Sequence, residues 1–339
     1  MRAVVYSETG PSSVLQVVER DVPEPGPGEV RVRIARAGVN PTDWKQRAGG
    51  TYGALPYDEI VPGQDGAGTI DAVGPGVSGI SVGNRVWLFL AQHGSAFGTA
   101  EEYVVVPVRK AVPLPEAASF DVGASLGVPA VTAHRALTSG PIADRLAPGT
   151  LTGRTVLVQG GAGAVGNAAI QLGRWAGATV IATVSSDEKA ELARAAGADH
   201  IVNYREADTE AVIREIAPDG VDLIVEVAPA ANNDLDRAVV RNGGTIAIYA
   251  NNGGDELTMP VRATFALNVR YQFVLLYGVA DELVDAAAED ITAALAAGAL
   301  GVGEEHGVPL HRFGLDQASQ AHDAVEAGAV GKVLIDLDA

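Results

Sequence analysis

A glycine-rich turn between an expected strand and an expected helix constrains this chain more than any other feature of its sequence. The strand is the apolar run 155–158, and the helix covers 164–176. Gly161, Gly163 and Gly166 fit the pattern G-x-G-x-x-G at their junction. In such a turn the backbone comes close to a pyrophosphate, and the N–H groups of the helix N-terminus attract its charge. A turn that serves only packing is the alternative, but the flanking elements favour a dinucleotide-binding fold.

The strand that follows this turn indicates which nucleotide it binds. An NAD site would place Asp or Glu at the end of the next strand, 179–184. Here Ser185 and Ser186 follow that strand, and Lys189 comes shortly after them. Two hydroxyl groups and a cation suit a 2′-phosphate, although Lys189 by itself could be a solvated charge on a helix. The sequence therefore predicts NADPH, with the turn itself as the phosphate contact: Gly161, Ala162, Gly163, Ala164, Val165 and Gly166.

Two patterns of expected elements divide the chain. Up to about residue 125, short runs of alternating apolar and polar residues lie between Gly and Pro clusters, which predicts a β-rich barrel or sandwich. From about residue 129, strands alternate with helices, which predicts an α/β fold with a Rossmann-like, doubly wound parallel sheet. We place the β-rich domain at 1–127, completed by 279–339, and the dinucleotide-binding domain at 128–278.

Composition narrows the classes of function. The chain has 339 residues, a net charge of −18 and no cysteine. This negative charge repels phosphate backbones and anionic lipids, which makes nucleic acid and membranes poor partners. Without cysteine there is no disulfide, no thiolate-bound zinc and no Cys nucleophile. Because the sequence shows neither a long apolar span nor the apolar run of a signal peptide, we expect a cytoplasmic protein.

A second glycine-rich stretch, 62–86, precedes the dinucleotide fold, and together they resemble the medium-chain dehydrogenase/reductase superfamily. In the zinc alcohol dehydrogenases of that superfamily a His-Glu pair follows the first glycine, where this chain has Gln64 and Asp65. Since no cysteine can complete a Cys/His site, we expect no metal. Further motifs look like the zinc-free quinone oxidoreductases, the zeta-crystallin group: 37–43, 47–52, 127–137, 321–322 and 331–334. The resemblance implies that the β-rich domain is a GroES-like barrel.

The resemblance also implies residues around the nicotinamide. Asn40, Pro41 and Asp43 would lie on the wall of the cleft, with Pro41 and Asp43 among the cofactor contacts. Tyr52 would lie near the nicotinamide ring, and Thr132 would contact its carboxamide.

Residues that follow later strands would flank other parts of the cofactor. The resemblance places Tyr204 beside the 2′-phosphate, and it places Tyr249, Asn251 and Asn252 beside the nicotinamide ribose. Relatives often carry Asp-Ser-Val-Gly where this chain has 226–229, so the resemblance assigns no contacts to that segment.

With neither a metal nor a nucleophile, the remaining reaction is direct hydride transfer from NADPH to a quinone or another α,β-unsaturated carbonyl. Tyr52 could give the substrate a hydrogen bond or a proton, or it could line the wall while water supplies the proton. Asn40 could polarise the carbonyl, or it could be a turn residue before Pro41. Two other functions stay open: an enoyl-thioester reductase, and a non-catalytic NADPH-binding protein with a structural or regulatory role.

An apolar strand at the expected edge of the parallel sheet points to a second copy of the chain. This strand runs from Tyr271 to Leu276. An exposed apolar edge promotes association unless it is paired. We therefore expect a homodimer joined at this strand, which the family resemblance also implies.

Overall fold

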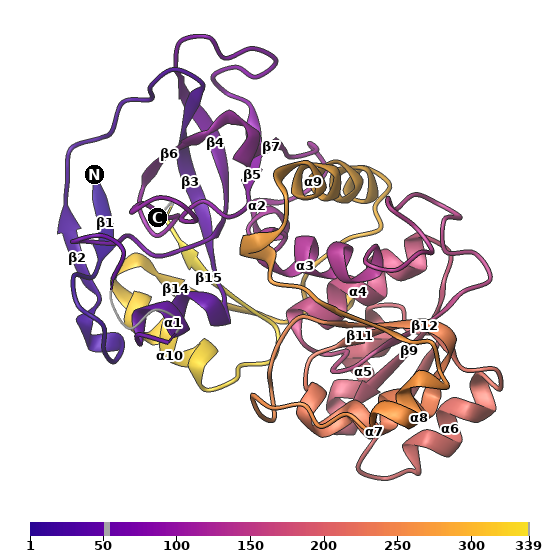
Figure 1. Ribbon diagram of the computed structural model, residues 1–339. Helices are drawn as coiled ribbons and strands as arrows, with labels where there is room; N and C mark the ends of the chain where they lie inside the picture. Colours follow the sequence, from indigo (N-terminus) through magenta and orange to yellow (C-terminus); the bar gives the residue numbers. More distant parts are fainter. Residues whose placement is uncertain (51–54, 338–339) are drawn as a thin grey trace. The chain divides into compact units, whose positions relative to one another are not determined.

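The computed structural model describes residues 1–50 and 55–337. The chain divides into two compact units (Figure 1). The first unit comprises Met1–Val128 and Pro309–Ala339, and the second comprises Pro129–Val308.

The second unit holds a parallel sheet. Residues 129–308 are all described, and they form six parallel strands in the order β10-β9-β8-β11-β12-β13. The strands are β8 (Thr155–Val158), β9 (Thr179–Val184), β10 (His200–Asn203), β11 (Val221–Glu226), β12 (Val240–Ile248) and β13 (Arg270–Phe273). Chain order reverses between β8 and β11, and ligands of such sheets bind outside the carboxyl ends of the strands at this point. The predicted doubly wound fold is confirmed.

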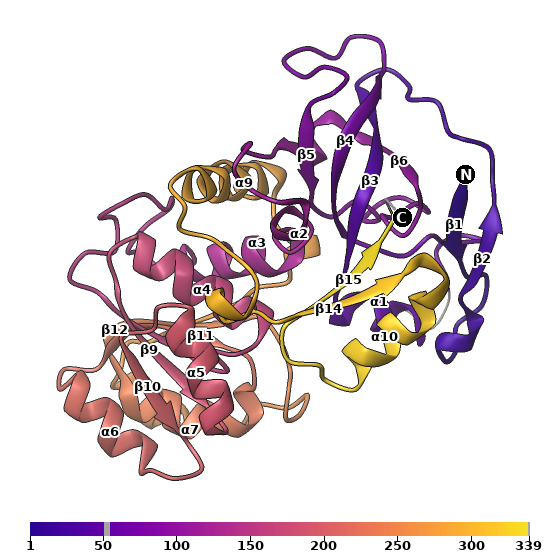
Figure 2. The same cartoon turned by 180° about the vertical axis from the view of Figure 1, so that it is seen from behind.

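Five helices connect these strands: α4 (Ala164–Trp175), α5 (Asp187–Ala195), α6 (Thr209–Ile216), α7 (Pro229–Val239) and α8 (Val261–Phe265). Helix α3 (Gly127–Leu137) precedes the first strand, and α9 (Asp281–Ala296) follows the last. Figure 2 shows β10 at one edge of the sheet beside β9, with α5 and α6 packed next to it. Among residues 1–50 and 55–337, no helix has the length and apolar character needed to span a membrane.

In the described part of the first unit, a largely antiparallel sheet runs in the order β14-β15-β3-β4-β5-β7, and β6 also pairs with β3. Its strands are β3 (Glu29–Val39), β4 (Asp65–Val73), β5 (Arg85–Leu88), β6 (Tyr103–Pro107), β7 (Ala111–Pro113), β14 (Leu310–Gly314) and β15 (Lys332–Asp336). A smaller sheet pairs β1 (Arg2–Val5) with β2 (Gln16–Glu19), and the helices are α1 (Pro41–Arg47), α2 (Phe120–Gly123) and α10 (Ala318–Glu326). Because β15 pairs with β3, the end of the chain completes this β-rich unit.

The boundary between the two units near the C-terminus differs from the sequence prediction. Residues 279–308 belong to the second unit, whereas the sequence predicted them with the β-rich domain. Within the second unit, His134 on α3 and Asp290 on α9 join through a bond of 2.8 Å between Nε2 and Oδ2. Gln171 on α4 donates through Nε2 to the carbonyl of Gly301 at 3.1 Å. These buried contacts hold α9 and the segment after it against the helices of the parallel sheet.

Element ends also differ from the sequence prediction. The edge strand ends at Phe273 rather than Leu276, because β12 ends at Ile248 and the last ladder bond, from Val274 N, reaches the carbonyl of Ile248. Helix α7 begins at Pro229, since proline is well tolerated at the first helical position.

Removing the Asp290 carboxylate is expected to destabilise the second unit. This carboxylate accepts hydrogen bonds from His134, Arg145 and the N–H of Leu146. Burial opposes its charge, but these donors prevail and lower the pKa of Asp290 to about 2. Asp290→Ala leaves the buried donors unpaired, so chemical denaturation at pH 7 should show a loss of about 3 kcal/mol. Glu289→Ala removes a mostly exposed partner of Arg145 and should cost less than about 1 kcal/mol. Equal losses for the two variants would contradict this account.

Candidate functional site

The glycine-rich turn joins β8 to α4 at the carboxyl edge of the parallel sheet. The positive φ of +71° lies at Gly160, one residue before the predicted motif. A Cβ at Gly161 would lie 2.8 Å from the Cβ of Ala182, and one at Gly166 would lie 2.4 Å from the carbonyl oxygen of Gly160. Since real Cβ atoms do not approach so closely, both positions require glycine.

Packing does not require glycine at position 163, because a Cβ on Gly163 would contact only the carbonyl oxygen of Gly160, at an ordinary distance of 3.5 Å. Gly163 is exposed and forms the N-cap of α4. Ala164 and Val165, the first helical residues, are partly exposed, whereas Ala162 and Gly166 are buried. The first N–H groups of a helix have no partner within it and attract anions. The turn therefore presents backbone donors next to open space.

A cationic and hydroxyl-rich cluster lies at the same edge, beyond β9. Lys189 Nζ donates to Ser185 Oγ at 3.1 Å, and Ser186 caps α5 by accepting from the N–H of Lys189 at 3.4 Å. The N–H of Tyr204 bonds to the carbonyl of Val184 at 3.1 Å, which brings the exposed Tyr204 beside the end of β9. The structure thus brings together the four residues predicted around the 2′-phosphate.

The residues predicted around the nicotinamide ribose follow β12. The N–H of Tyr249 bonds to the carbonyl of Glu226, and the N–H of Asn252 bonds to the carbonyl of Val227, both at 3.1 Å. Asn251 and Asn252 are exposed, and Asn251 Nδ2 donates to Asp255. Burial raises the pKa of Tyr249, which keeps its hydroxyl protonated. Thr132 lies in α3 and is buried.

The carboxyl edge of the sheet also holds a buried polar group that sequence reasoning missed. Gln159 follows β8, and its Nε2 donates to Asp236 Oδ1 at 2.9 Å. Thr183 Oγ1 in β9 donates to Gln159 Oε1 at 2.6 Å. Glu226, at the end of β11, is fully buried and hydrogen-bonds to Asp236. The one sequence feature that could have indicated this buried group is the difference from the family's Asp-Ser-Val-Gly at residues 226–229.

In the first unit, three side chains form a buried hydrogen-bonded cluster. Lys332 Nζ donates to Asn40 Oδ1 at 2.7 Å and to Asp65 Oδ2 at 2.9 Å. Asn40 Nδ2 donates to the same Asp65 oxygen at 2.8 Å, and the N–H of Val128 donates to Asp65 Oδ1 at 2.7 Å. Exposure of the three side chains is 3% or less. The lysine can only donate, so it fixes which end of the Asn40 amide is the oxygen.

Other residues predicted for the cleft wall lie next to this cluster in sequence. Pro41 opens α1 and is exposed. Asp43 Oδ2 accepts from the N–H of Asn40 at 2.7 Å, while its Oδ1 finds no hydrogen-bond partner among the described residues. Burial raises the pKa of Asp43 to about 7. Tyr52 lies outside the described residues.

The position expected to carry zinc ligands in related dehydrogenases does not fit the metal. Gln64 Nε2 donates to Gln92 Oε1 at 2.8 Å, and Asp65 is neutralised by Lys332. Zinc sites are built from several thiolate, imidazole and carboxylate ligands. In the part of the chain that the structure describes, no group of three His, Asp or Glu side chains is placed to hold a metal ion.

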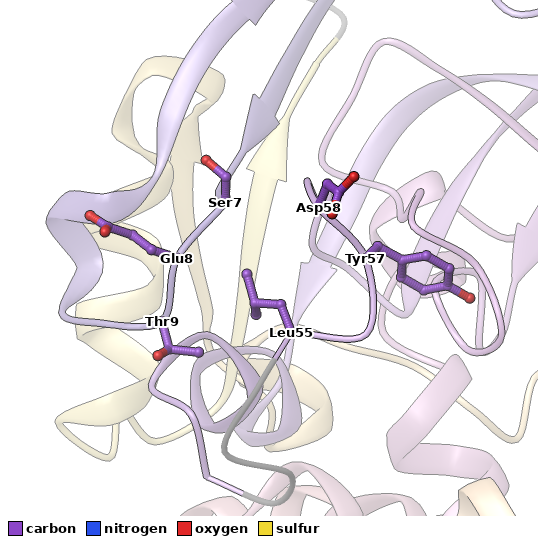
Figure 3. Close-up of a pocket in the computed structure, with 6 residues that line it drawn as sticks. All are labelled: Ser7, Glu8, Thr9, Leu55, Tyr57 and Asp58. Carbon is purple, nitrogen blue, oxygen red and sulfur yellow. The ribbon is translucent and has the colours of Figure 1, made fainter.

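A hollow of about 370 Å³ lies on the first unit (Figure 3). It is lined by Ser7, Glu8, Thr9, Leu55, Tyr57 and Asp58. Its two charged lining residues, Glu8 and Asp58, are acidic and would repel a phosphate.

Comparison with known proteins gives the family. The protein-family model described as "Alcohol dehydrogenase GroES-like domain" matches residues 26–116 of this chain, and the family model described as "Zinc-binding dehydrogenase" matches residues 164–296. The quinone oxidoreductase of Rattus norvegicus is 32% identical over 342 residues, which cover 99% of this chain and 97% of the relative.

The solved structures that match this chain include two at the same level of identity. The crystal structure of an NAD-dependent alcohol dehydrogenase has a TM-score of 0.86, and that of a mycobacterial protein complexed with NADPH has a TM-score of 0.82. Each is 31% identical, and each match covers 99% of this chain and 100% of the other.

The buried Asp43 carboxyl should make stability depend on pH. Its pKa of about 7 in the folded protein exceeds the ordinary value of 3.8, so the folded state holds a proton that the unfolded state loses first. The free energy of unfolding should therefore fall between about pH 4 and pH 7, by up to about 1.4 kcal/mol per pH unit from this group. Asp43→Asn should remove that part of the slope, measured by denaturation from pH 4 to 8. Asp58→Asn, an exposed control in the same unit, should leave it unchanged. An unchanged slope in Asp43→Asn would disprove the assignment.

Proposed function

Because this chain belongs to the quinone oxidoreductase family of the medium-chain dehydrogenase/reductase superfamily, we propose that it transfers a hydride from NADPH to a quinone or another α,β-unsaturated carbonyl, without zinc. The observation that carries this proposal is the pairing of a glycine-rich turn with the Ser185–Lys189 contact at one edge of the parallel sheet. Backbone donors at the turn receive the diphosphate, and the lysine neutralises a phosphate on the adenosine ribose.

The choice of NADPH over NADH depends on the end of β9. Solved relatives differ in their nucleotide, since one is named an NAD-dependent alcohol dehydrogenase and another is complexed with NADPH. In this chain Ser185, Ser186 and Lys189 follow the strand where an NAD site would place a carboxylate. The exposed ring of Tyr204 beside them offers a surface for the adenine. These side chains favour the nucleotide that carries the extra phosphate.

We propose the acceptor from the family and from the polar side chains near Asn40. The bound nicotinamide would supply the hydride, and the protein would orient it and exclude water. Conjugated carbonyls suit this reaction because they spread the arriving negative charge. Asn40 keeps one N–H beyond the one that it gives to Asp65, and Lys332 polarises its amide through Oδ1. We propose that this N–H contacts the acceptor carbonyl, and that Tyr52 is the proton donor.

In this proposal the protein works without zinc because the hydrogen-bonding capacity of the Asp65 carboxylate is already used. The one carboxylate at the expected ligand position already accepts from an ammonium, an amide and a backbone N–H. A divalent cation would have to displace a buried lysine whose charge repels it. Lys332 therefore supplies the positive charge on this wall of the site.

Turnover of an acceptor separates this proposal from a non-catalytic NADPH-binding protein. Purified protein mixed with NADPH and a panel of quinones and enones should lower the absorbance of the reduced nicotinamide. Addition of a chelator should leave the rate unchanged, because the chemistry needs no metal. NADPH binding without oxidation by any acceptor would instead favour a binding protein. Turnover restricted to thioester-linked enones would favour an enoyl-thioester reductase.

Replacing Lys189 should change the preference between nucleotides. Lys189→Ala removes the cation proposed for the 2′-phosphate, so the Kd for NADPH should rise by about tenfold or more while that for NADH changes little. Fluorescence titration with each nucleotide measures both constants. Arg194→Ala removes a positive charge from the exposed end of the same helix and should leave both nearly unchanged. Equal weakening of NADPH and NADH in Lys189→Ala would contradict the proposed phosphate site.

We further propose that two copies of the chain associate through β13, the edge strand of the parallel sheet. Phe273 and Leu275 are about two-thirds exposed there, and Phe265 on the short helix α8 is 71% exposed. Pairing this edge with its symmetry mate would cover the apolar side chains and the unpaired backbone groups. A cytoplasmic location remains a prediction from the sequence.

Light scattering at micromolar concentration tests the association. The unmodified chain should have the mass of a dimer, and Phe273→Glu should give a monomer because it places like charges at the shared edge. Glu282→Gln, a surface change elsewhere in the second unit, should leave the dimer intact. A monomeric unmodified chain would contradict the proposal.

A further inference from the structure

A chain of buried hydrogen bonds connects the phosphate-binding turn to a pair of acidic side chains. It begins at the N–H of Gly160, which donates to Thr183 Oγ1 at 3.2 Å. It continues from Thr183 Oγ1 to Gln159 Oε1 at 2.6 Å, and from Gln159 Nε2 to Asp236 Oδ1 at 2.9 Å. The turn after β8, the strand β9 and the helix α7 contribute to it, and its polar side chains are 2% exposed or less.

The direction of each bond is fixed by chemistry. A backbone N–H can only donate, so Thr183 Oγ1 accepts from Gly160 and has its single proton left for Gln159. Gln159 must then accept through Oε1, which turns its NH₂ group toward Asp236. Asp236 Oδ1 is consequently an acceptor, and any proton that Asp236 carries lies on its other oxygen.

Glu226 hydrogen-bonds to Asp236, and we assign this bond to the second oxygen because Oδ1 accepts from Gln159. Two carboxyl groups can share a hydrogen bond only if one of them is protonated. Glu226 accepts from the N–H of Ala228 and from Asn232 Nδ2, donors that favour a carboxylate. The proton therefore belongs to Asp236, which is neutral and donates to Glu226.

We propose that Asp236, in its neutral form, is a positioning residue for the cofactor turn, holding Gln159 and Thr183 in the orientation that fixes Gly160. The proposal rests on the proposed NADPH function and adds to it a dependence of cofactor affinity on one buried proton. Loss of the proton would break the bond to Glu226. It would also place a second negative charge behind a turn that receives a diphosphate.

The surroundings of Asp236 favour the neutral acid at neutral pH. Burial raises the pKa of Asp236 well above its usual range, and the negative charge of Glu226 raises it further. The other titratable groups nearby are Tyr249 after β12, Tyr271 on β13, and Asp234 and Arg237 on α7. Burial raises the pKa of both tyrosines, so neither carries a negative charge at neutral pH.

The chain offers a neutral replacement that reproduces the proposed hydrogen bonds. In Asp236→Asn, Nδ2 can donate to Glu226 while Oδ1 accepts from Gln159, as the protonated acid does. Asp236→Ala removes both contacts. Asp234→Asn changes an acid two residues away on the same helix that is exposed and paired with Arg237, so it serves as a matched control.

The experiment is a fluorescence titration with NADPH from pH 7 to 10, where the 2′-phosphate is fully ionised. For the unmodified chain and Asp234→Asn, the Kd should rise by about tenfold as a buried charge develops. Asp236→Asn should keep the neutral-pH Kd of the unmodified chain and vary much less with pH. Asp236→Ala should bind weakly throughout. An unchanged pH dependence in Asp236→Asn, or a Kd at pH 7 as weak as that of Asp236→Ala, would overturn the proposal.

Thermal denaturation without nucleotide separates failure of this proposal from failure of the proposed function. Because the folded-state pKa of Asp236 is raised, stability is lost as pH rises through that value. Asp236→Asn should lose less stability than the unmodified chain between pH 5 and 9, whether or not NADPH binds. Identical pH profiles of melting would overturn the assignment of the proton. Absence of NADPH binding by the unmodified chain, with the expected melting difference, would contradict only the cofactor role.

Discussion

The parallel alignment of the six strands is the constraint on which the dinucleotide site depends. It brings the ends of β8, β9, β10, β11 and β12 to one edge, although these ends are spread from Val158 to Ile248 in the sequence. The glycine turn can close at this edge because Gly161 and Gly166 allow α4 to approach the strands. The groups assigned to the cofactor after β8, β9 and β12 are held by backbone that this alignment fixes.

A different constraint shapes the first unit, where a buried lysine must be neutralised. Lys332 is on β15, near the end of the chain, and Asp65 begins β4. Pairing of β15 with β3 and of β3 with β4 brings them within 2.9 Å of each other. Breaking such a pair leaves an uncompensated buried charge, so the orientation of Asn40 is tied to the sheet itself.

Local sequence signals predicted much of this architecture, and long-range pairings account for what they missed. The turn at Gly161–Gly166 and the cluster around Lys189 are encoded within about thirty residues, so they could be read directly. The contact between Lys332 and Asp65 spans 267 positions, and no local pattern reveals it. The pairing of Glu226 with Asp236 depends on which face of α7 carries Asp236. The inclusion of residues 279–308 in the second unit depends on contacts such as the bond between His134 and Asp290. Tyr52 and the acceptor stay predictions from family resemblance.

A crystal structure of the protein grown with NADPH would test the central claim most directly. The account predicts the diphosphate against the backbone N–H groups of 161–166 and the 2′-phosphate within hydrogen-bond distance of Ser185 and Lys189. Phosphates bound away from these residues, or a 2′-phosphate without a contact from Lys189, would contradict it.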